Sequence, residues 1–478
     1  MTLNHYQKIH CVGIGGIGVS AIAQFLLAQG KEISGSDVAE TEITQFLRAQ
    51  GIKVFIGHAE ANLHDSELII YSDAVPADNP ERIAAHKRGI AELSYAQALG
   101  QISRNFKTIV VTGTHGKSTT TVMLGLILET AGFDPLVMVG TRVPQWGNSN
   151  LRLPAILRHR EENRDVSNFA QQNLETSHFP FQIPDSRFFI VEGDDYRDHF
   201  LELSPYAVVV TNIEYDHPDY FRNLDHTVES FKNLVEKVPE DGFIVVNEDD
   251  RGCQQLFDQM VHSPSRTTRR VMPYGRKNEI FGILNLQVPG EFNRYNAAAA
   301  ATCALELGVP RDIVERTLAE FRGVWRRFEI VGQFQDLRFK IQDSPTIISD
   351  YGHHPSAIKA TMKAVRKLYY GRRLVLVYQP HQHSRTKRLF SEFVEALKDV
   401  ADFVIVSEIY AVKGRMEDHD VSSRNIVEKI GRANVIYGGG LKQTDKLVRN
   451  MMQPGDVVIF MGAGDIDLLV RDLVIARL

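Results

Sequence analysis

The sequence predicts an α/β protein made of three consecutive domains. The chain has 478 residues, whereas a single hydrophobic core stops growing at about 250–300 residues. Strand and helix patterns alternate along the chain, and this order is typical of parallel sheets. Two glycine-rich loops, at residues 13–18 and 113–119, each follow an apolar strand pattern and precede a helix pattern. We expect domain boundaries that give residues 1–106, 107–321 and 322–478.

The composition excludes several classes of protein. Hydrophobic residues make up 43% and charged residues 24%, which excludes a disordered or collagen-like chain. The net charge of −5 favours neither nucleic acid nor an anionic membrane as a partner. No apolar run approaches the ~20 residues that span a bilayer, and the three cysteines form no Cys-x-x-Cys pair. We therefore expect a cytoplasmic protein, monomeric or homodimeric, that binds neither nucleic acid nor a membrane.

The first domain is predicted to be Rossmann-like because strand and helix signals alternate in it. Helical periodicity at residues 19–29 ends at Gly30, and short apolar runs flank it. The predicted strands are 8–13, one that starts at 32–34, 53–56 and 68–71, and the predicted helices are 19–29, 43–50 and 84–88.

The loop at residues 13–18 reads Gly-Ile-Gly-Gly-Ile-Gly. Glycines there let the backbone approach a diphosphate, and the amides at the start of the next helix attract anions. Asp37 closes the second strand, where a carboxylate often binds a ribose. A dinucleotide enzyme is the simplest interpretation, but such turns serve many ligands and also occur without one. The loop therefore indicates a nucleotide diphosphate of unstated identity.

The loop at residues 113–119, Gly-Thr-His-Gly-Lys-Ser-Thr, is a more specific motif. Its amides can cradle a polyphosphate, Lys117 can reach the β- and γ-oxygens, and the Ser118 hydroxyl can ligate Mg²⁺. Val111 stands where the usual P-loop has its first glycine, so this loop is shortened. The motif predicts a P-loop-type central ATPase domain. A simple dehydrogenase needs only one nucleotide loop, so the second loop argues against that class.

Acidic side chains follow two predicted strands of the central domain. Glu192 comes after residues 188–191, and the run Thr-Asn-Ile-Glu-Tyr-Asp-His occupies residues 211–217. Ligand sites gather at the carboxyl ends of parallel strands, and Mg²⁺ takes oxygen ligands. Glu192 with Ser118 would therefore serve one ion. For three other carboxylates two interpretations are equally open, a solvated position on a loop or a role that supports the metal ligands: Asp194, Asp195 and Asp216.

The remaining elements follow the same α/β pattern. The central domain has further predicted strands at 107–112, 207–211 and 242–246 and helices at 119–131, 296–307 and 309–320; the third domain has strands at 346–349, 374–378, 403–406 and 457–461. Residues 151–187 contain no glycine and are rich in polar side chains. We interpret them as a partly helical surface insertion, with a substrate-contacting lid as the alternative.

Taken together, these motifs resemble the Mur ligases, the ATP-dependent amide-forming enzymes of peptidoglycan synthesis. The resemblance covers nearly the whole chain. Besides the two loops, its markers are residues 34–37, 72–80, 211–217, 293–296, 326–328, 350–355, 379–381, 385–386 and 462–466. It implies a UDP-substrate domain, an ATP-binding domain and a Rossmann-like C-terminal ligase domain. It also implies that ATP, with Mg²⁺, phosphorylates the carboxylate of UDP-N-acetylmuramate and that L-alanine attacks the acyl phosphate.

The resemblance implies three sets of site residues. The UDP substrate would contact Gly15, Gly16, Ile17, Gly18, Ser36, Asp37 and Ser72. ATP would contact Gly113, Thr114, His115, Gly116, Lys117, Ser118, Thr119, Asn293, Asn296, Arg327 and Asp350, with Ser118, Glu192 and His217 around Mg²⁺. The catalytic residues would be Lys117, His354, His381 and Arg385. From the residues alone, the two adjacent histidines 353 and 354 also fit packing and capping roles, and Arg385 also fits a surface charge on a loop.

The sequence departs from the family pattern at several positions, among them residues 411–414, which read Ala-Val-Lys-Gly. Phe292 replaces a usual histidine near the adenine, and Gln382 and His383 replace a usual Arg-Tyr pair, which leaves amino-acid selection open. One alternative is a recycling ligase that joins a peptide to UDP-N-acetylmuramate. An NAD-dependent oxidoreductase would leave the second loop unexplained. A non-catalytic binder conflicts with the intact set of Lys117 and predicted metal ligands.

Overall fold

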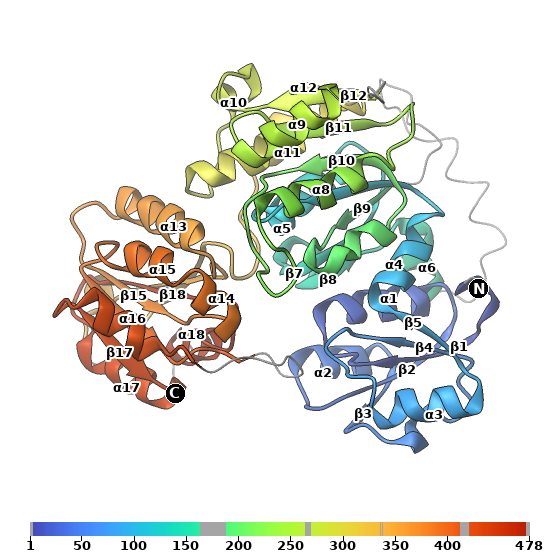
Figure 1. Ribbon diagram of the computed structural model, residues 1–478, viewed down its shortest axis with the longest axis horizontal. Coiled ribbons are helices and arrows are strands. Elements are labelled where there is room, and N and C mark those ends of the chain that lie inside the picture. The colour runs from blue at the N-terminus through green and yellow to red at the C-terminus, as the bar shows by residue number, and fades with distance from the viewer. Residues whose placement is uncertain are drawn as a thin grey trace. The chain divides into compact units, whose positions relative to one another are not determined.

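Three mainly parallel sheets, each covered by helices, make up the described chain (Figure 1). The computed structural model describes residues 3–162, 188–262, 269–334, 336, 338–411 and 420–474. Backbone contacts divide the chain into two units. The first, with two sheets, comprises Met1–Ile213, Val228–Leu284 and Asn296–Leu318; the second, with the third sheet, comprises Glu214–Thr227, Asn285–Tyr295 and Ala319–Leu478. The predicted α/β architecture is confirmed.

The first sheet has five parallel strands in the order β3-β2-β1-β4-β5. Its elements are β1 (Lys8–Val12), α1 (Ile17–Ala28), β2 (Glu32–Asp37), α2 (Glu42–Ala49), β3 (Lys53–Ile56), β4 (Leu68–Tyr71), α3 (Pro80–Arg88), β5 (Ala91–Ser94) and α4 (Tyr95–Ser103). The chain passes from β1 to β2 on one side and later places β4 on the other. The glycine loop after β1 therefore lies where the strand order reverses, which is where such sheets bind ligands.

Helix α3 begins four residues before the predicted start at residue 84. The Asn79 side chain caps it by accepting a hydrogen bond from the amide of Glu81 at 2.9 Å, and Pro80 occupies the first helical position. Gly89 ends the helix with φ at 68°. Asn-Pro before the helix and Gly after it are local start and stop signals. The sequence prediction also missed β5 and α4.

The second sheet has seven strands in the order β12-β11-β10-β6-β9-β7-β8, parallel except for the β7–β8 pair. Its strands are β6 (Lys107–Thr112), β7 (Leu136–Val143), β8 (Ser149–Arg152), β9 (Phe188–Glu192), β10 (Pro205–Val210), β11 (Phe243–Asn247) and β12 (Arg270–Tyr274). The helices in this part of the chain are α5 (Lys117–Thr130), α6 (Ala155–Glu162), α8 (Leu224–Val235), α9 (Arg251–His262), α10 (Glu279–Ile283), α11 (Glu291–Glu306) and α12 (Arg311–Ala319). Strand β6 lies between β9 and β10, so the loops after these three strands share one edge of the sheet.

The third sheet has six strands in the order β13-β14-β18-β15-β16-β17, and only β13 runs antiparallel to its neighbour. Its strands are β13 (Glu329–Gln333), β14 (Thr346–Asp350), β15 (Leu374–Tyr378), β16 (Phe403–Ser407), β17 (Val435–Gly439) and β18 (Val457–Met461). Its helices are α13 (Pro355–Leu368), α14 (His383–Arg388), α15 (Phe390–Leu397), α16 (Ser423–Ile430), α17 (Leu441–Met451) and α18 (Asp467–Val474).

Both faces of the third sheet are packed against hydrophobic side chains. Leu374 and Leu376 of β15 belong to one buried cluster, whereas Val375 and Val377 belong to the other. Neighbouring residues of a strand point to opposite faces. Strands covered on both faces read as continuous apolar runs, which is why the sequence revealed the four inner strands. The edge strands β13 and β17 were not predicted.

The segment 151–187 begins differently from the predicted surface insertion. Leu151 and Arg152 are the end of edge strand β8, and both are 5% exposed. Helix α6 follows, in agreement with the partly helical prediction. Residues 163–187 lie outside the described part of the chain. Among the described residues, none of the helices combines the length and the hydrophobicity that a membrane span requires.

Candidate active site

The loop between β6 and α5 has a backbone that only glycines fit at two positions. Gly113 has φ at 137° and Gly116 has φ at 82°, both in the region that side chains rarely adopt. A Cβ at Gly113 would collide with Oγ1 of Thr211, and one at Gly116 would collide with Oδ1 of Asn296. The loop is therefore enclosed closely by neighbouring side chains. The predicted ATP residue Asn296 lies against it.

The segment after β10 fixes the phosphate loop through hydrogen bonds. The Thr114 amide donates to the carbonyl of Asn212 at 3.0 Å, and the His115 amide donates to Oδ1 of Asn212 at 2.9 Å. The hydroxyl of Thr211 and the side-chain amide of Asn212 both donate to the carbonyl of His115, at 2.6 and 2.9 Å. Thr211 and Asn212 were not among the predicted site residues, although both lie at the end of a strand, where ligand sites gather.

The side chain of Lys117, the first residue of α5, is fixed by hydrogen bonds at the phosphate loop. Its Nζ donates to the carbonyl of Gly113 at 2.6 Å and to Oδ1 of Asp195 at 2.9 Å. Burial alone would lower the pKa of Lys117, but Asp195 and Asp194 outweigh burial and raise it. The ammonium is thus charged and placed at the loop, as a polyphosphate requires. Asp195 is 1% exposed, so a solvated loop carboxylate is the wrong interpretation for it.

Ser118 and Glu192, two of the three predicted metal ligands, lie together. Oγ of Ser118 donates to Oε1 of Glu192 at 3.0 Å, and the Gly140 amide donates to Oε2 at 2.7 Å. Glu192 is the last residue of β9, as predicted. A hydroxyl and a carboxylate at a strand end are the oxygen donors that Mg²⁺ takes, so these residues fit that ion. His217 belongs to the second unit, and its metal role stays a prediction.

The first glycine loop has its own acidic partner. The Gly15 amide donates to Oδ2 of Asp37 at 2.8 Å, and a Cβ at Gly15 would lie at the same distance from that oxygen. Asp37 is the last residue of β2. A Cβ at Gly18 would lie 2.7 Å from the ring of Tyr95. The loop glycines are thus required by close packing, and Gly15 and Asp37 are brought together as expected.

The side chain of Ser36, which was predicted to contact the UDP substrate, points into the protein interior. Its side chain is fully buried, and its hydroxyl donates to Oε2 of Glu81 at 2.5 Å. Its carbonyl accepts the amides of Gly13 and Ile14 at 2.8 and 3.0 Å. Ser36 therefore supports the loop through its backbone. The other predicted residues of this set surround the same turn, with Gly16 and Ile17 at the start of α1 and Ser72 directly after β4.

Several predicted residues gather in the second unit around the start of α13. Asp350 ends β14, and its carboxylate accepts the amides of Phe328 and Gly352, each at 2.8 Å. Burial raises the pKa of Asp350. The guanidinium of Arg327 lies over the Tyr351 ring, 4.5 Å from its centroid. These contacts order the segment, whereas contacts of Asp350 and Arg327 with a nucleotide stay predictions.

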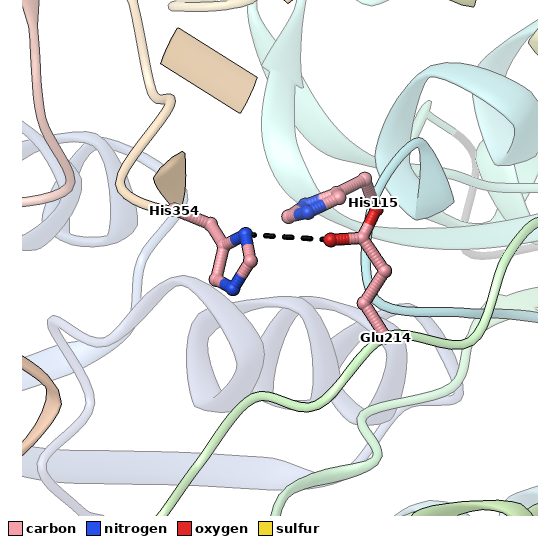
Figure 2. A group of neighbouring side chains, drawn as sticks. All are labelled: His115, Glu214 and His354. Carbon is pink, nitrogen blue, oxygen red and sulfur yellow. Dashed lines mark ion pairs between the residues drawn. The ribbon is translucent and has the colours of Figure 1, made fainter. Parts of the chain in front are cut away.

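His354 is the N-cap of α13, as its alternative capping role predicts. Its Nδ1 accepts a hydrogen bond from the Ser356 amide at 3.4 Å and lies 3.4 Å from Oε2 of Glu214. Figure 2 shows the His354 ring turned toward the Glu214 carboxylate. The Ser356 hydroxyl also donates to Glu214, at 2.8 Å. Glu214 was not among the predicted site residues.

Arg385 is neither on a loop nor a surface charge. It lies in helix α14 and is 1% exposed. Its Nε donates to Oδ1 of Asp216 at 2.8 Å, and its Nη1 contacts Nδ1 of His381 at 3.2 Å. Burial would raise the pKa of Asp216, but Arg385 and the nearby histidines hold it well below its usual range. Both acidic partners, Glu214 and Asp216, lie in the run of residues 211–217 that follows β10.

The positions that depart from the family pattern have defined places. Gln382 has φ at 71°, and its backbone amide donates to the carbonyl of Tyr410 at 2.9 Å. Nδ1 of His383 lies 2.9 Å from the carbonyl of Val421. Phe292 packs against the hydrophobic cluster of the third sheet, and Nδ2 of Asn293 donates to the carbonyl of Pro289 at 2.7 Å. A role of Asn293 at the adenine stays a prediction.

The fold and the phosphate loop define a multidomain α/β protein with a P-loop-type nucleotide site. Family models match along the chain: the Mur ligase family catalytic domain at residues 8–107, the Mur ligase middle domain at 111–304, and the Mur ligase glutamate ligase domain at 326–464. The UDP-N-acetylmuramate–L-alanine ligase of Alkaliphilus metalliredigens is 32% identical over 99% of this chain and 98% of its own length. The chain belongs to the Mur ligase family.

Two solved structures are similar over almost the full length. The UDP-N-acetylmuramate-alanine ligase MurC of Thermotoga maritima has a TM-score of 0.74 and 26% identity, covering 98% of both chains. A murein peptide ligase of Psychrobacter arcticus has a TM-score of 0.67 and 20% identity, covering 97% of both chains. The second likeness concerns the fold alone.

Proposed function

We propose that this Mur ligase uses ATP to join L-alanine to the carboxylate of UDP-N-acetylmuramate, a step of peptidoglycan synthesis. The observation that carries the proposal is the similarity, over 99% of the chain, to the Alkaliphilus ligase of that name. In this proposal residues 1–106 bind the UDP substrate, residues 107–321 bind ATP, and residues 322–478 form the ligase domain.

The reaction needs activation because a carboxylate is a poor electrophile at neutral pH. Transfer of the γ-phosphoryl group of ATP to a carboxylate oxygen gives an acyl phosphate and ADP. The L-alanine amine then attacks the acyl carbon, phosphate leaves, and an amide forms with loss of a proton from nitrogen. The charged Lys117 at the phosphate loop supports the first step, since it offsets negative charge on the transferring group.

Ser118 and Glu192 are the proposed magnesium ligands, with His217 as a third. When bound, Mg²⁺ would offset charge on the phosphate oxygens. The glycine loop after β1, with Gly15 and Asp37, is the proposed site of the UDP diphosphate and ribose. His354, His381 and Arg385 are proposed to act near the muramoyl carboxylate and the amino acid. We place the reaction in the cytoplasm, in keeping with three cysteines that are all unpaired.

The test is turnover measured as ADP release and as the amide product by mass spectrometry. ATP, Mg²⁺, UDP-N-acetylmuramate and L-alanine together should give product, and omission of any one should abolish it. Lys117→Ala should lower turnover by at least a hundredfold. Near-normal turnover in that variant would contradict the assignment of the phosphate loop.

The identity of the acceptor is tested by comparing turnover with a panel of amino acids and with the tripeptide L-alanyl-γ-D-glutamyl-diaminopimelate. The departures at Gln382 and His383, which leave amino-acid selection open, are the reason to test this second candidate. Preference for L-alanine supports the proposal, whereas preference for the tripeptide makes the chain a recycling ligase. Titration with NADH, followed by its fluorescence, tests the oxidoreductase alternative.

A further inference from the structure

A buried chain of polar groups in the second unit links Asp216 to His381 through Arg385. Asp216 is 3% exposed and Arg385 is 1% exposed. Nε of Arg385 donates to Oδ1 of Asp216 at 2.8 Å, and Nη1 lies 3.2 Å from Nδ1 of His381. The two charges compensate each other in a place where an uncompensated charge would be costly.

The contact between Arg385 and His381 defines which ring nitrogen carries a proton. A guanidinium has donors and no acceptor, so Nδ1 of His381 must accept. A nitrogen that accepts a hydrogen bond has no proton of its own, and the neutral ring therefore carries its proton on Nε2. The ring is also fixed in orientation because it stacks on Tyr410, with centroids 5.5 Å apart and planes at 10°.

Asp216 is itself held in place by surrounding groups. The His217 amide donates to Oδ1 at 2.7 Å, and Nε2 of His353 lies 3.7 Å from Oδ2. The carbonyl of His353 accepts a hydrogen bond from the Tyr378 hydroxyl at 3.3 Å. Asp216 thus presents one carboxylate oxygen to Arg385 in a fixed direction, as a group that orients a second group must.

We propose that Asp216 is a positioning residue that fixes Arg385, and that Arg385 in turn fixes His381 with Nδ1 as acceptor and the proton on Nε2. This proposal assigns a role to an acidic residue that contacts Arg385, one of the proposed catalytic residues, which in turn contacts His381. Its kinetic test rests on the proposed function. His381 would then offer Nε2–H, and not Nδ1, to a substrate.

The first measurement is nitrogen-15 NMR of histidine side chains in the full-length chain. The His381 signals are assigned by their loss in His381→Gln. Wild-type protein should show Nδ1 of His381 as the unprotonated nitrogen. Asp216→Asn should shift His381 toward a mixture of tautomers, and Asp216→Glu should restore part of the wild-type pattern. A wild-type ring with its proton on Nδ1, or an unchanged pattern in Asp216→Asn, would overturn the proposal.

The second measurement separates kcat from KM in the ligation assay. Asp216→Asn should lower kcat about ten- to a hundredfold while KM for ATP changes less than twofold, because the phosphate loop is untouched. Asp219, which is exposed, provides the matched control: Asp219→Asn should retain both kcat and KM.

If Asp216→Asn does not fold, Arg385→Lys serves as the second variant. It keeps the charge but removes Nη1, so Nδ1 of His381 should lose its hydrogen bond. Unchanged kcat in the folded variant contradicts the proposal. Absence of ligation in wild type would count against the proposed function alone, since the NMR result is independent of turnover.

Discussion

Nζ of Lys117 lies 2.9 Å from Oδ1 of Asp195, a carboxylate from a different strand end that is almost fully buried. The pair keeps a cation charged and aimed at the phosphate loop although burial opposes its charge. The pair joins a residue of the glycine motif to one that the motif does not contain.

Loss of the Asp195 carboxylate should impair Lys117 in a pH-dependent manner. In Asp195→Asn, the carboxylate that raises the pKa of Lys117 is gone, so burial should lower that pKa. As the pH rises, Lys117 should then lose its proton earlier than in wild type, and kcat should decline at a lower alkaline pH. At pH 7.5 we expect roughly tenfold lower kcat. The pH profile of ADP release measures this. Asp258→Asn, on the exposed side of α9, changes net charge equally and should behave as wild type.

Substitution of Gly116 should abolish ATP binding for a steric reason. Gly116→Ala combines φ at 82° with a collision against Asn296. Gly30 has φ at 86° with open space around its Cβ position, so Gly30→Ala carries the backbone strain of about 1 kcal/mol without the collision. Calorimetric titration with ATP should show no binding to Gly116→Ala and normal binding to Gly30→Ala. Equal affinities in the two variants would contradict this account.

Removal of the Asn212 side chain should loosen the phosphate loop. Asn212→Ala deletes two hydrogen bonds to the backbone of His115, each of which contributes about 1 kcal/mol. We expect ATP affinity to fall about tenfold and kcat to fall less. Asn105→Ala, which removes an exposed side-chain amide in the turn between α4 and β6, is the control. An unchanged dissociation constant would show that the loop is rigid without Asn212.

Glu81 should make stability depend on pH in the acid range. Burial alone would raise its pKa, but nearby His10 and hydrogen bonds from Ser36 and Asn62 lower it from 4.5 to about 2. Since the folded pKa lies below the unfolded one, the ionised group stabilises the fold above pH 4.5 by about 3 kcal/mol. This contribution is lost as pH falls from 4.5 to about 2.

Urea unfolding of the full chain at pH 7 and pH 3 checks the Glu81 prediction. Glu81→Gln should be less stable than wild type at pH 7, and the gap should narrow at pH 3. Glu92→Gln is the matched control, because Glu92 forms a part-exposed pair with Arg82 that contributes at most about 1 kcal/mol. A gap that is the same at both pH values would contradict the sign of the pKa shift.

Metal dependence should involve Glu192. Glu192→Gln retains the shape of the side chain but lowers its charge, so the Mg²⁺ concentration for half-maximal turnover should rise about tenfold or more. Removal of Mg²⁺ with EDTA should abolish turnover in wild type, and added Mg²⁺ should restore it. Glu202→Gln is the control for charge. Full activity of wild type in EDTA would contradict the proposed metal site.

The sequence could predict those parts of the site that local motifs encode. Glycines with positive φ and a carboxylate at a strand end are local features, and Gly116 and Glu192 lie as predicted. Helix α5 begins at Lys117, two residues before the predicted start at residue 119. Asp195 and Asn212 could not be distinguished from solvated loop residues. Their roles depend on which strands are neighbours, and strand order is not a local property.

By itself, the sequence determined the α/β architecture, the two glycine loops and the resemblance to one family, because periodicity and turn chemistry act over a few residues. Only the tertiary structure decided that Ser36 is buried against Glu81 and that Arg385 is enclosed by Asp216 and His381. The physical reason is that burial of a charge is tolerated only beside a partner of opposite charge. Here that partner lies 169 positions away along the chain.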